Sequence, residues 1–298
     1  MTKKLALLNA TLFSPNYRTF EKTNLLLINQ KIAGIGYIPD DDNSTQIDFT
    51  GHYIFPNVFN PLIQENILDG QLDHAIQQRL IHQGITATGV ISSEANTCQG
   101  NCLHHCLSQT DGVTAFPIHQ SEPESSNMLG LWVTDNTNAN TIEKTIQFNR
   151  SLLSEFNTFS IRNTTKYPSA SWLLFINTLS ELDQLFDINR PSFSVSIASH
   201  LIEQANHETL IEWIKSNRIS SIHIGDNAKR ILAPFPLLYP ALDIATIHAL
   251  FSTNILTTYS LKLKHVAIGH SPNLTIFEPK TGTINAVVLN GHYHQLHP

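Results

Sequence analysis

Hydrophobic positions along the chain follow two patterns in turn, one typical of strands and one typical of helices. Short apolar runs bounded by glycine or polar residues predict buried strands at 53–64, 84–92, 113–119, 130–135, 171–177, 192–198 and 219–226. Longer segments with apolar residues at helical spacing predict helices at 67–82, 142–156, 208–216, 235–242 and 244–252. Because strands and helices follow one another, the pattern favours a parallel α/β barrel.

The two ends of the chain have a different pattern. Residues 4–10 and 24–36 alternate between apolar and polar positions, and the second run stops at Gly34 and Gly36. Two similar runs lie near the C-terminus, at 273–279 and 284–293. These four segments predict the strands of a small β unit that is separate from the alternating pattern between them.

The composition is that of a globular chain with few charges. Of the 298 residues, 41% are hydrophobic and 14% are charged, and the formal net charge is -6. An acidic balance without basic runs argues against nucleic acid as a partner. No apolar run is long enough to cross a membrane, and the apolar stretch after Met1 is too short for a signal peptide. Because three clustered cysteines form no secreted disulfide framework, we expect a cytoplasmic protein.

Three segments resemble the amidohydrolase superfamily, and dihydroorotases in particular. The first leads from 25–36 through an acidic loop to the apolar segment 47–56. The second is 236–254, which begins Pro-Leu-Leu-Tyr-Pro-Ala-Leu, and the third comprises the two C-terminal runs. In that family both chain ends form one β-sandwich beside the barrel. The resemblance therefore implies a small β-sandwich domain of residues 1–52 plus 264–298, and a barrel domain of residues 53–263.

The predicted barrel is short of one strand. The family barrel has eight strands, whereas the hydrophobic pattern gives seven. The gap lies between the strands at 192–198 and 219–226, where only about twenty residues, mostly helical in pattern, are present. We therefore expect an α/β fold with a shortened or incomplete (β/α)8 TIM-like barrel, whose seam is either open or filled by another element.

The resemblance also assigns the residues of a zinc site to the ends of the barrel strands. Dihydroorotases carry Asp-x-His-x-His after the first strand, one histidine after each of the fifth and sixth strands, and an aspartate after the last. The matching positions here are Asn60, Leu62, Gln64, Asn177, Ser199 and Asp226, and a fourth-strand aspartate falls on Asp135. Two substrate-binding positions of the family fall on Asn66 and near Ser93.

Replacement of the histidines removes the chemistry of this site. Leu62 has no donor atom, and the amide of Gln64 is a poor zinc ligand. The two remaining carboxylates, Asp135 and Asp226, cannot hold zinc tightly or lower the pKa of its bound water without imidazole ligands. We therefore expect no catalytic residue, no metal and no cofactor, and we interpret Asp135 and Asp226 as vestigial positions that order strand ends.

A relocated metal site is one alternative. The densest cluster of candidate ligands comprises Cys98, Cys102, His105 and Cys106; if this segment is helical, the three cysteines share one face and His105 lies nearby. Its spacing matches no established zinc motif, and buried cysteines also pack as small apolar residues. Helix packing and zinc binding therefore both remain open for this cluster.

The resemblance implies a catalytically inactive dihydroorotase-like protein. Such proteins accompany the catalytic chain of aspartate carbamoyltransferase in some bacteria and are needed for its assembly, so we expect this enzyme of pyrimidine biosynthesis as partner in a hetero-oligomer. The alternative is an active amidohydrolase that hydrolyses a cyclic amide with zinc at Asp135, Asp226 and His200 or His223. A third interpretation is a ligand-binding module that uses the emptied pocket.

Overall fold

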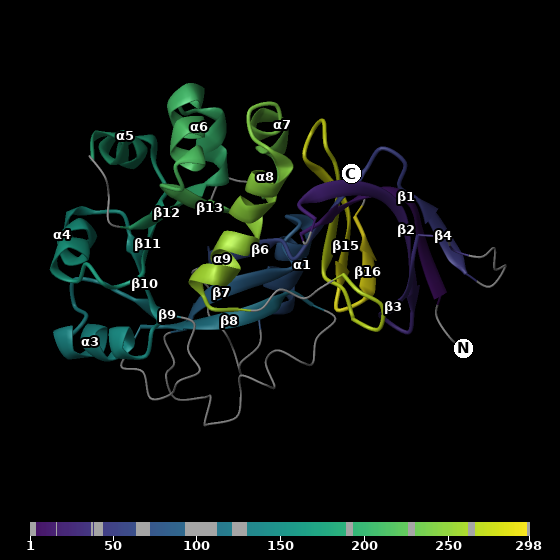
Figure 1. Cartoon of the computed structure of the whole chain (residues 1–298). Helices are drawn as coiled ribbons and strands as arrows, with labels where there is room; N and C mark the ends of the chain where they lie inside the picture. Colours follow the sequence, from purple (N-terminus) through teal and green to yellow (C-terminus); the bar gives the residue numbers. More distant parts are fainter. Residues whose placement is uncertain are drawn as a thin grey trace.

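The fold consists of two bodies built from one chain. The computed structural model describes residues 4–15, 17–36, 38, 44–63, 72–92, 112–120, 130–188, 193–225, 230–261 and 266–296. Figure 1 shows helices around a curved sheet in one body, whereas the other consists of strands and contains both termini. None of the described helices is long and apolar enough to cross a membrane.

The smaller body is a sheet formed by both ends of the chain. Its strands follow the order β16-β15-β14-β5-β1-β2-β3, and β4 pairs with β1. The strands are β1 (Lys4–Ser14), β2 (Thr19–Ile28), β3 (Lys31–Ile35), β4 (Thr45–Asp48), β5 (Tyr53–Pro56), β14 (Leu274–Glu278), β15 (Thr283–Leu289) and β16 (His292–Gln295). Antiparallel pairing of β5 with β14 joins the two chain ends. The predicted small β body made from both ends is therefore confirmed.

The apolar segment at 53–64 is divided between the two bodies. We expected a single strand, but β5 ends at Pro56 and belongs to the sheet of the chain ends, whereas β6 (Phe59–Ile63) opens the larger sheet. Asn57 between them has a positive φ of 56°, a conformation that asparagine tolerates better than most residues and that breaks a strand. The limits of the two domains at residues 52 and 264 stay a prediction.

Among the described residues, the larger body is built on eight parallel strands in the order β13-β12-β11-β10-β9-β8-β7-β6. After β6 come β7 (Ala87–Ser92), β8 (Thr114–His119), β9 (Gly130–Trp132), β10 (Ser151–Glu155), β11 (Trp172–Ile176), β12 (Ser194–Ala198) and β13 (Ile219–His223). Strand order follows chain order, as successive right-handed β-α crossovers give. The α/β class with a TIM-like barrel is therefore confirmed, but the count of seven strands is wrong.

The strand missing from the sequence prediction is β10. We expected one helix from Ile142 to Phe156, because the apolar residues of this segment fall at helical spacing. Helix α3 (Ala139–Gln147) ends earlier, since Asn149 adopts a positive φ of 54° and starts a turn. The apolar pair that follows the turn is the centre of β10, not a continued helix. The gap that we placed after the strand at 192–198 therefore does not exist.

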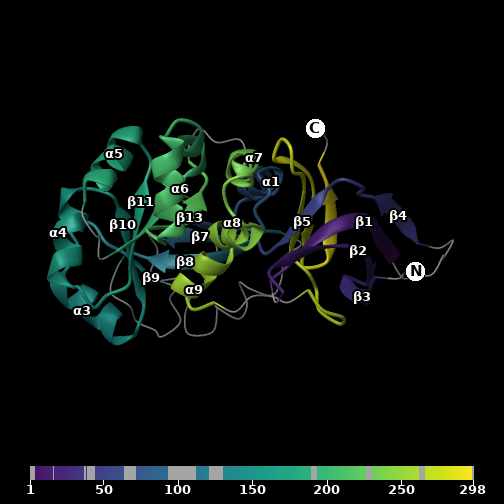
Figure 2. The same cartoon turned by 45° about the horizontal axis from the view of Figure 1, so that its top comes forward.

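Helices cover the outer face of the curved sheet (Figure 2). They are α1 (His74–His82), α3, α4 (Thr158–Lys166), α5 (Leu179–Asp187), α6 (His207–Lys215), α7 (Phe235–Leu238) and α8 (Ile244–Phe251). Helix α4 was not among the predicted helices, because its Thr- and Asn-rich sequence hides the helical pattern. Its start is fixed by Asn157, whose side chain accepts from the backbone N–H of Ser160 in a capping box.

Helix α9 (Thr253–Thr258) fills the concave side of the sheet. Ile255, Leu256 and Tyr259 pack against the inward-facing residues of the strands, such as Phe59 and Leu173. Three hydrogen bonds tie the segment to the sheet: Tyr259 Oη donates to the Pro61 carbonyl over 2.7 Å, Ser151 Oγ to the Thr258 carbonyl over 2.6 Å, and Asn254 Nδ2 to the Ser220 carbonyl over 2.8 Å. The sequence prediction had ended its last helix before this element.

A seam remains where β6 and β13 meet. Among the described residues these two strands share no backbone ladder, so the sheet has a seam here; it lies between the first and last strands and does not come from the missing strand that we expected. The buried amide of Asn60 spans the seam, since its Oδ1 accepts from the backbone N–H of Ile224 over 2.9 Å. Its Nδ2 donates to the Leu62 carbonyl over 2.7 Å. One side-chain hydrogen bond, from Ile224 to Asn60, therefore crosses the seam where a ladder is absent.

An aromatic cluster joins the two bodies. Phe55 and Phe277 of the smaller sheet pack against Phe235 of α7, with ring centroids 5.7 and 4.9 Å from that of Phe235. His248 of α8 lies 4.4 Å from the ring of Phe13, and its Nε2 donates to the carbonyl of Pro56 over 2.9 Å. Burial lowers the pKa of His248 to about 4. A neutral histidine at this position can pack as a ring and still satisfy a buried carbonyl.

Candidate functional site

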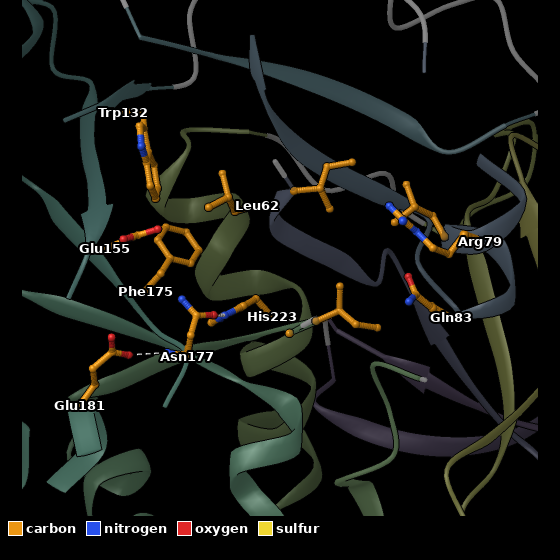
Figure 3. Close-up of a pocket in the computed structure, with 13 residues that line it drawn as sticks. Leu62, Arg79, Gln83, Trp132, Glu155, Phe175, Asn177, Glu181 and His223 are labelled. Carbon is orange, nitrogen blue, oxygen red and sulfur yellow. Dashed lines mark hydrogen bonds between the residues drawn. The ribbon is translucent and has the colours of Figure 1, made fainter. Parts of the chain in front are cut away.

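A cavity of 490 Å³ opens at the carboxyl ends of the barrel strands. Its described walls come from five strand ends and two helices, and Figure 3 shows the side chains that reach it. They include Leu62 of β6, Trp132 of β9, Glu155 of β10, Phe175 and Asn177 at the end of β11, Glu181 of α5, His223 of β13, and Arg79 and Gln83 of α1. In a parallel barrel this end carries the functional residues, because all the strand-to-helix loops leave the sheet there.

His223 is the imidazole of this cavity, and both of its ring nitrogens are engaged. Nδ1 lies 3.0 Å from the hydroxyl of Ser196, and Nε2 lies 3.0 Å from Oδ1 of Asn177. Because an amide oxygen only accepts, Nε2 carries the proton, and Nδ1 accepts from Ser196. Neither nitrogen of the neutral ring has a lone pair left for another partner.

Burial keeps this ring neutral. His223 is 4% exposed, and its removal from water lowers its pKa to about 3, with a further lowering from the neighbouring ring of His200. The ring of Phe175 meets it edge to face at 5.3 Å. At neutral pH the imidazole therefore brings no positive charge to the cavity.

Leu62 lies where the resemblance places the first zinc-ligand histidine. Its side chain is 8% exposed and faces the cavity with carbon atoms alone. Asn60, two residues earlier, is fully buried and holds the seam of the barrel. Both positions of β6 therefore have a packing or structural role.

Among the described residues, two carboxylates reach the cavity. Glu181 closes the first turn of α5, since its Oε2 accepts from the backbone N–H groups of Asn177 and Thr178 over 2.8 and 3.1 Å. Glu155 at the end of β10 is exposed to the cavity. Neither residue was expected from the sequence. Two asparagines gave the signal that a strand ends at Glu155. Asn149 interrupts the helical pattern after α3, and Asn157 caps the next helix, so the short apolar run between them is a strand.

The correct strand count also moves the expected positions by one strand. Asn177, which we matched to the end of the fifth strand, follows the sixth strand of the sheet, and Ser199 follows the seventh. The end of the fifth strand is Glu155. Ser199 begins a 3-10 turn, Ser199–Glu203, with its hydroxyl buried, and it is not among the described residues that line the cavity.

The remaining candidates do not join this cavity among the described residues. Asp135 lies in an exposed turn three residues beyond β9. His200 is half-buried and lies against Gly225. A Cβ atom added at Gly225 would lie 2.7 Å from Nδ1 of His200. Seven positions named from the sequence lie outside the described residues: Gln64, Asn66, Ser93, Cys98, Cys102, His105 and Cys106. Asp226, the last-strand aspartate, also lies outside them.

The described residues do not fit the zinc ion that the amidohydrolase fold implies. No group of three or more His, Cys, Asp or Glu side chains in the described ranges is placed to hold a metal ion. Leu62 offers no donor atom, and the ring nitrogens of His223 are already bonded to Ser196 and Asn177. Zinc sites in catalysis use three or four nitrogen, sulfur or carboxylate ligands around an open position.

No protein-family model matches the sequence, and no curated protein matches it. Solved structures share its fold. A β-aspartyl dipeptidase from Fervidobacterium islandicum AW-1, in complex with β-Asp-Leu dipeptide, is 12% identical with a TM-score of 0.63, over 99% of this chain and 97% of that one. A dihydropyrimidinase from Brevibacillus agri NCHU1002 is 10% identical with a TM-score of 0.65, over 97% and 94%.

An L-hydantoinase (dihydropyrimidinase) from Arthrobacter aurescens is 9% identical with a TM-score of 0.64, over 100% of this chain and 98% of that one. Identities this low establish the fold and leave substrate and activity open. The chain therefore has the amidohydrolase-superfamily fold, a TIM-like barrel beside a β-sandwich made from both chain ends.

Proposed function

We propose that this chain is a non-catalytic protein of the amidohydrolase fold that acts as an assembly subunit of aspartate carbamoyltransferase in pyrimidine biosynthesis. The proposed absence of catalysis rests on the pair of hydrogen bonds at His223. A metal-ligand histidine must present a free lone pair, and here Ser196 and Asn177 occupy both nitrogens. Leu62 on β6, the strand across the seam from His223, adds no donor atom for a metal.

The assembly role rests on the resemblance to dihydroorotase-like subunits. A chain that keeps the barrel core and replaces the ligand positions has a fold without the chemistry usually built on it. Binding to a partner is a function that such a chain can still perform. A permanent subunit should bury more than about 1,200 Å² with its partner, in an arrangement that follows the symmetry of the trimeric transferase.

Co-expression tests the partner. The chain and the catalytic chain of aspartate carbamoyltransferase from the same genome should elute as one complex from a size-exclusion column at micromolar concentration. Each chain expressed alone is the control, and the transferase alone should show lower activity or a smaller assembly. Separate elution, with a transferase that assembles and works without this chain, would contradict the assembly role.

Metal analysis and a hydrolysis assay test the absence of catalysis. The purified chain should contain no stoichiometric zinc, and zinc added in excess should not give hydrolysis of dihydroorotate. One zinc per chain that disappears in Asp226→Ala would instead favour the active amidohydrolase with a reduced site. Zinc that disappears in Cys102→Ala would favour a structural metal cluster and would leave the assembly role standing.

A further inference from the structure

The emptied cavity has two unlike sides (Figure 3). Trp132, Glu155 and Phe175 gather on one side, and Glu181 lies below them. Arg79 and Gln83 of α1 lie on the opposite side. The side of the strand ends β9, β10 and β11 therefore combines aromatic rings with carboxylates and contains no cationic residue among those that line it.

Glu155 is the group on this side that is open to a ligand. Among the described residues, no side chain or backbone group donates a hydrogen bond to its carboxylate, and no cation pairs with it. Glu181 differs, because one of its oxygens already accepts two backbone N–H groups at the start of α5. A positively charged ligand group would therefore meet its principal partner at Glu155.

Two aromatic rings form the wall beside this carboxylate. Trp132 is 6% exposed and Phe175 is 1% exposed, so packing holds both rings in place. Their centroids are 5.8 Å apart, with the ring planes inclined by 49°. The face of a tryptophan attracts a cation, and a ring wall also shelters an apolar body from water.

The neighbouring polar groups add no positive charge that would oppose a cationic ligand. His223 is neutral, so it neither repels a cation nor attracts an anion. Asn177 uses its oxygen for His223, which leaves its amide N–H groups for a polar atom of a ligand. The chain as a whole is acidic, with a net charge of -6, and this also favours the approach of a cation.

We propose that this side of the cavity binds a small organic ammonium, with its charged nitrogen at Glu155 and its apolar body against Trp132 and Phe175. The site lies at the carboxyl ends of the barrel strands, in the same cavity as Leu62 and Asn177. The proposal goes beyond the assembly role and does not rest on it. A chain that fails to bind the transferase would still bind the ammonium, and the reverse also holds.

The probe is 2-phenylethylamine, which is cationic at pH 7, and 2-phenylethanol is its neutral control of nearly the same shape. Titration calorimetry, or ligand-observed NMR on the full chain, should give a dissociation constant at least about tenfold lower for the amine than for the alcohol. Equal affinities, or no binding of the amine at millimolar concentration, would overturn the proposal.

Variants locate the site. Glu155→Gln keeps the shape of the side chain and should weaken binding of the amine at least about tenfold, with little effect on the alcohol. Asp135→Asn is the matched control, because Asp135 is an exposed carboxylate on the same rim and lies outside the cavity lining. Circular dichroism and thermal unfolding confirm that both variants fold. Equal loss in the two variants, or no loss in Glu155→Gln, would show a diffuse charge effect and overturn the site.

Discussion

Nε2 of His223 donates to Oδ1 of Asn177 over 3.0 Å, and this contact joins the ends of β13 and β11, which are not neighbours in the sheet. The strand between them, β12, contributes Ser196, which bonds the other ring nitrogen. One buried imidazole therefore ties three strand ends together. The same ring that could have been a metal ligand serves instead as a structural link, and this link fixes the floor of the cavity.

A carboxylate in place of the amide should raise the pKa of His223. Asn177→Asp puts a negative charge beside Nε2 and favours the imidazolium, so the pKa should rise from about 3 by roughly one to three units. NMR titration of the imidazole C–H signals measures it. Asn177→Ala is the matched control, since it removes the acceptor without adding charge and should not raise the pKa to the same extent. Equal values in both variants would contradict the contact.

Acid should destabilise the protein through the buried rings of His223 and His248. Burial lowers the pKa of His223 to about 3 and that of His248 to about 4, both below the value of about 6.5 in an unfolded chain. Below pH 6.5 the unfolded state therefore binds more protons than the folded state. The free energy of unfolding should fall by about 1.4 kcal/mol per pH unit for each histidine, from pH 6.5 down to about pH 4.

Chemical denaturation at pH 6.5 and pH 5 separates this contribution from that of the carboxylates. His248→Gln removes one titrating group and keeps a donor for the carbonyl of Pro56, so it should reduce the slope by about 1.4 kcal/mol per pH unit. His82→Gln is the control, because His82 is exposed at the end of α1. A slope that is the same in both variants and in the wild type would contradict the burial of a neutral His248.

Much of the fold followed from the sequence because local pattern and tertiary packing agree. The strands at both chain ends alternate, and the central barrel strands are continuous apolar runs, as buried parallel strands require. The prediction failed where a single polar residue decides the outcome. Asn149 ends α3 through a positive φ, and without it the segment up to Phe156 has a continuous helical period. Because β10 was assigned to a helix, the predicted strand count was one too low, and a gap was assumed after the strand at 192–198.

The candidate site was harder to predict, because it depends on which strand ends lie side by side. The loss of donor atoms at Leu62 is visible in the sequence. The role of His223 is not, since Ser196 and Asn177 meet it only through the order of β11, β12 and β13. Glu155 was hidden by its assignment to a helix. Trp132 and Phe175 belong to no sequence motif, and they line the cavity only because their side chains point into it.

Gly225 should resist substitution. A Cβ atom there would lie 2.7 Å from Nδ1 of His200 and 2.9 Å from Cβ of Ala198, which is closer than van der Waals contact. Gly225→Ala should therefore lower the free energy of unfolding by about 1–3 kcal/mol, the usual cost of overpacking. Gly34→Ala is the control, because a Cβ at Gly34 meets its nearest atom at an ordinary 3.6 Å. Similar stability of the two variants would mean that His200 moves away at little cost.

Tyr259 should hold the helix inside the barrel, α9, to the seam strand β6. Tyr259, at the end of α9, is 1% exposed, and burial raises the pKa of its hydroxyl well above the usual value, so it remains a hydrogen-bond donor. It donates to the carbonyl of Pro61 on β6, beside the seam. Tyr259→Phe keeps the ring and leaves that carbonyl without its partner, which should cost about 1–3 kcal/mol of stability. Tyr259→Ala should cost about 3–5 kcal/mol, because it also opens a cavity among the inward-facing side chains.

Urea unfolding measures both changes, with Tyr17→Phe as the control, since Tyr17 is 75% exposed and its hydroxyl should contribute little. The two Tyr259 variants should also differ in amide hydrogen exchange. Tyr259→Phe should speed exchange in β6 and α9, because the hydrogen bond joins these elements across the barrel, and leave β2 and β15 unchanged. Stability equal to that of Tyr17→Phe, with unchanged exchange in β6, would mean that α9 does not hold the seam strand and that the barrel is closed by other contacts.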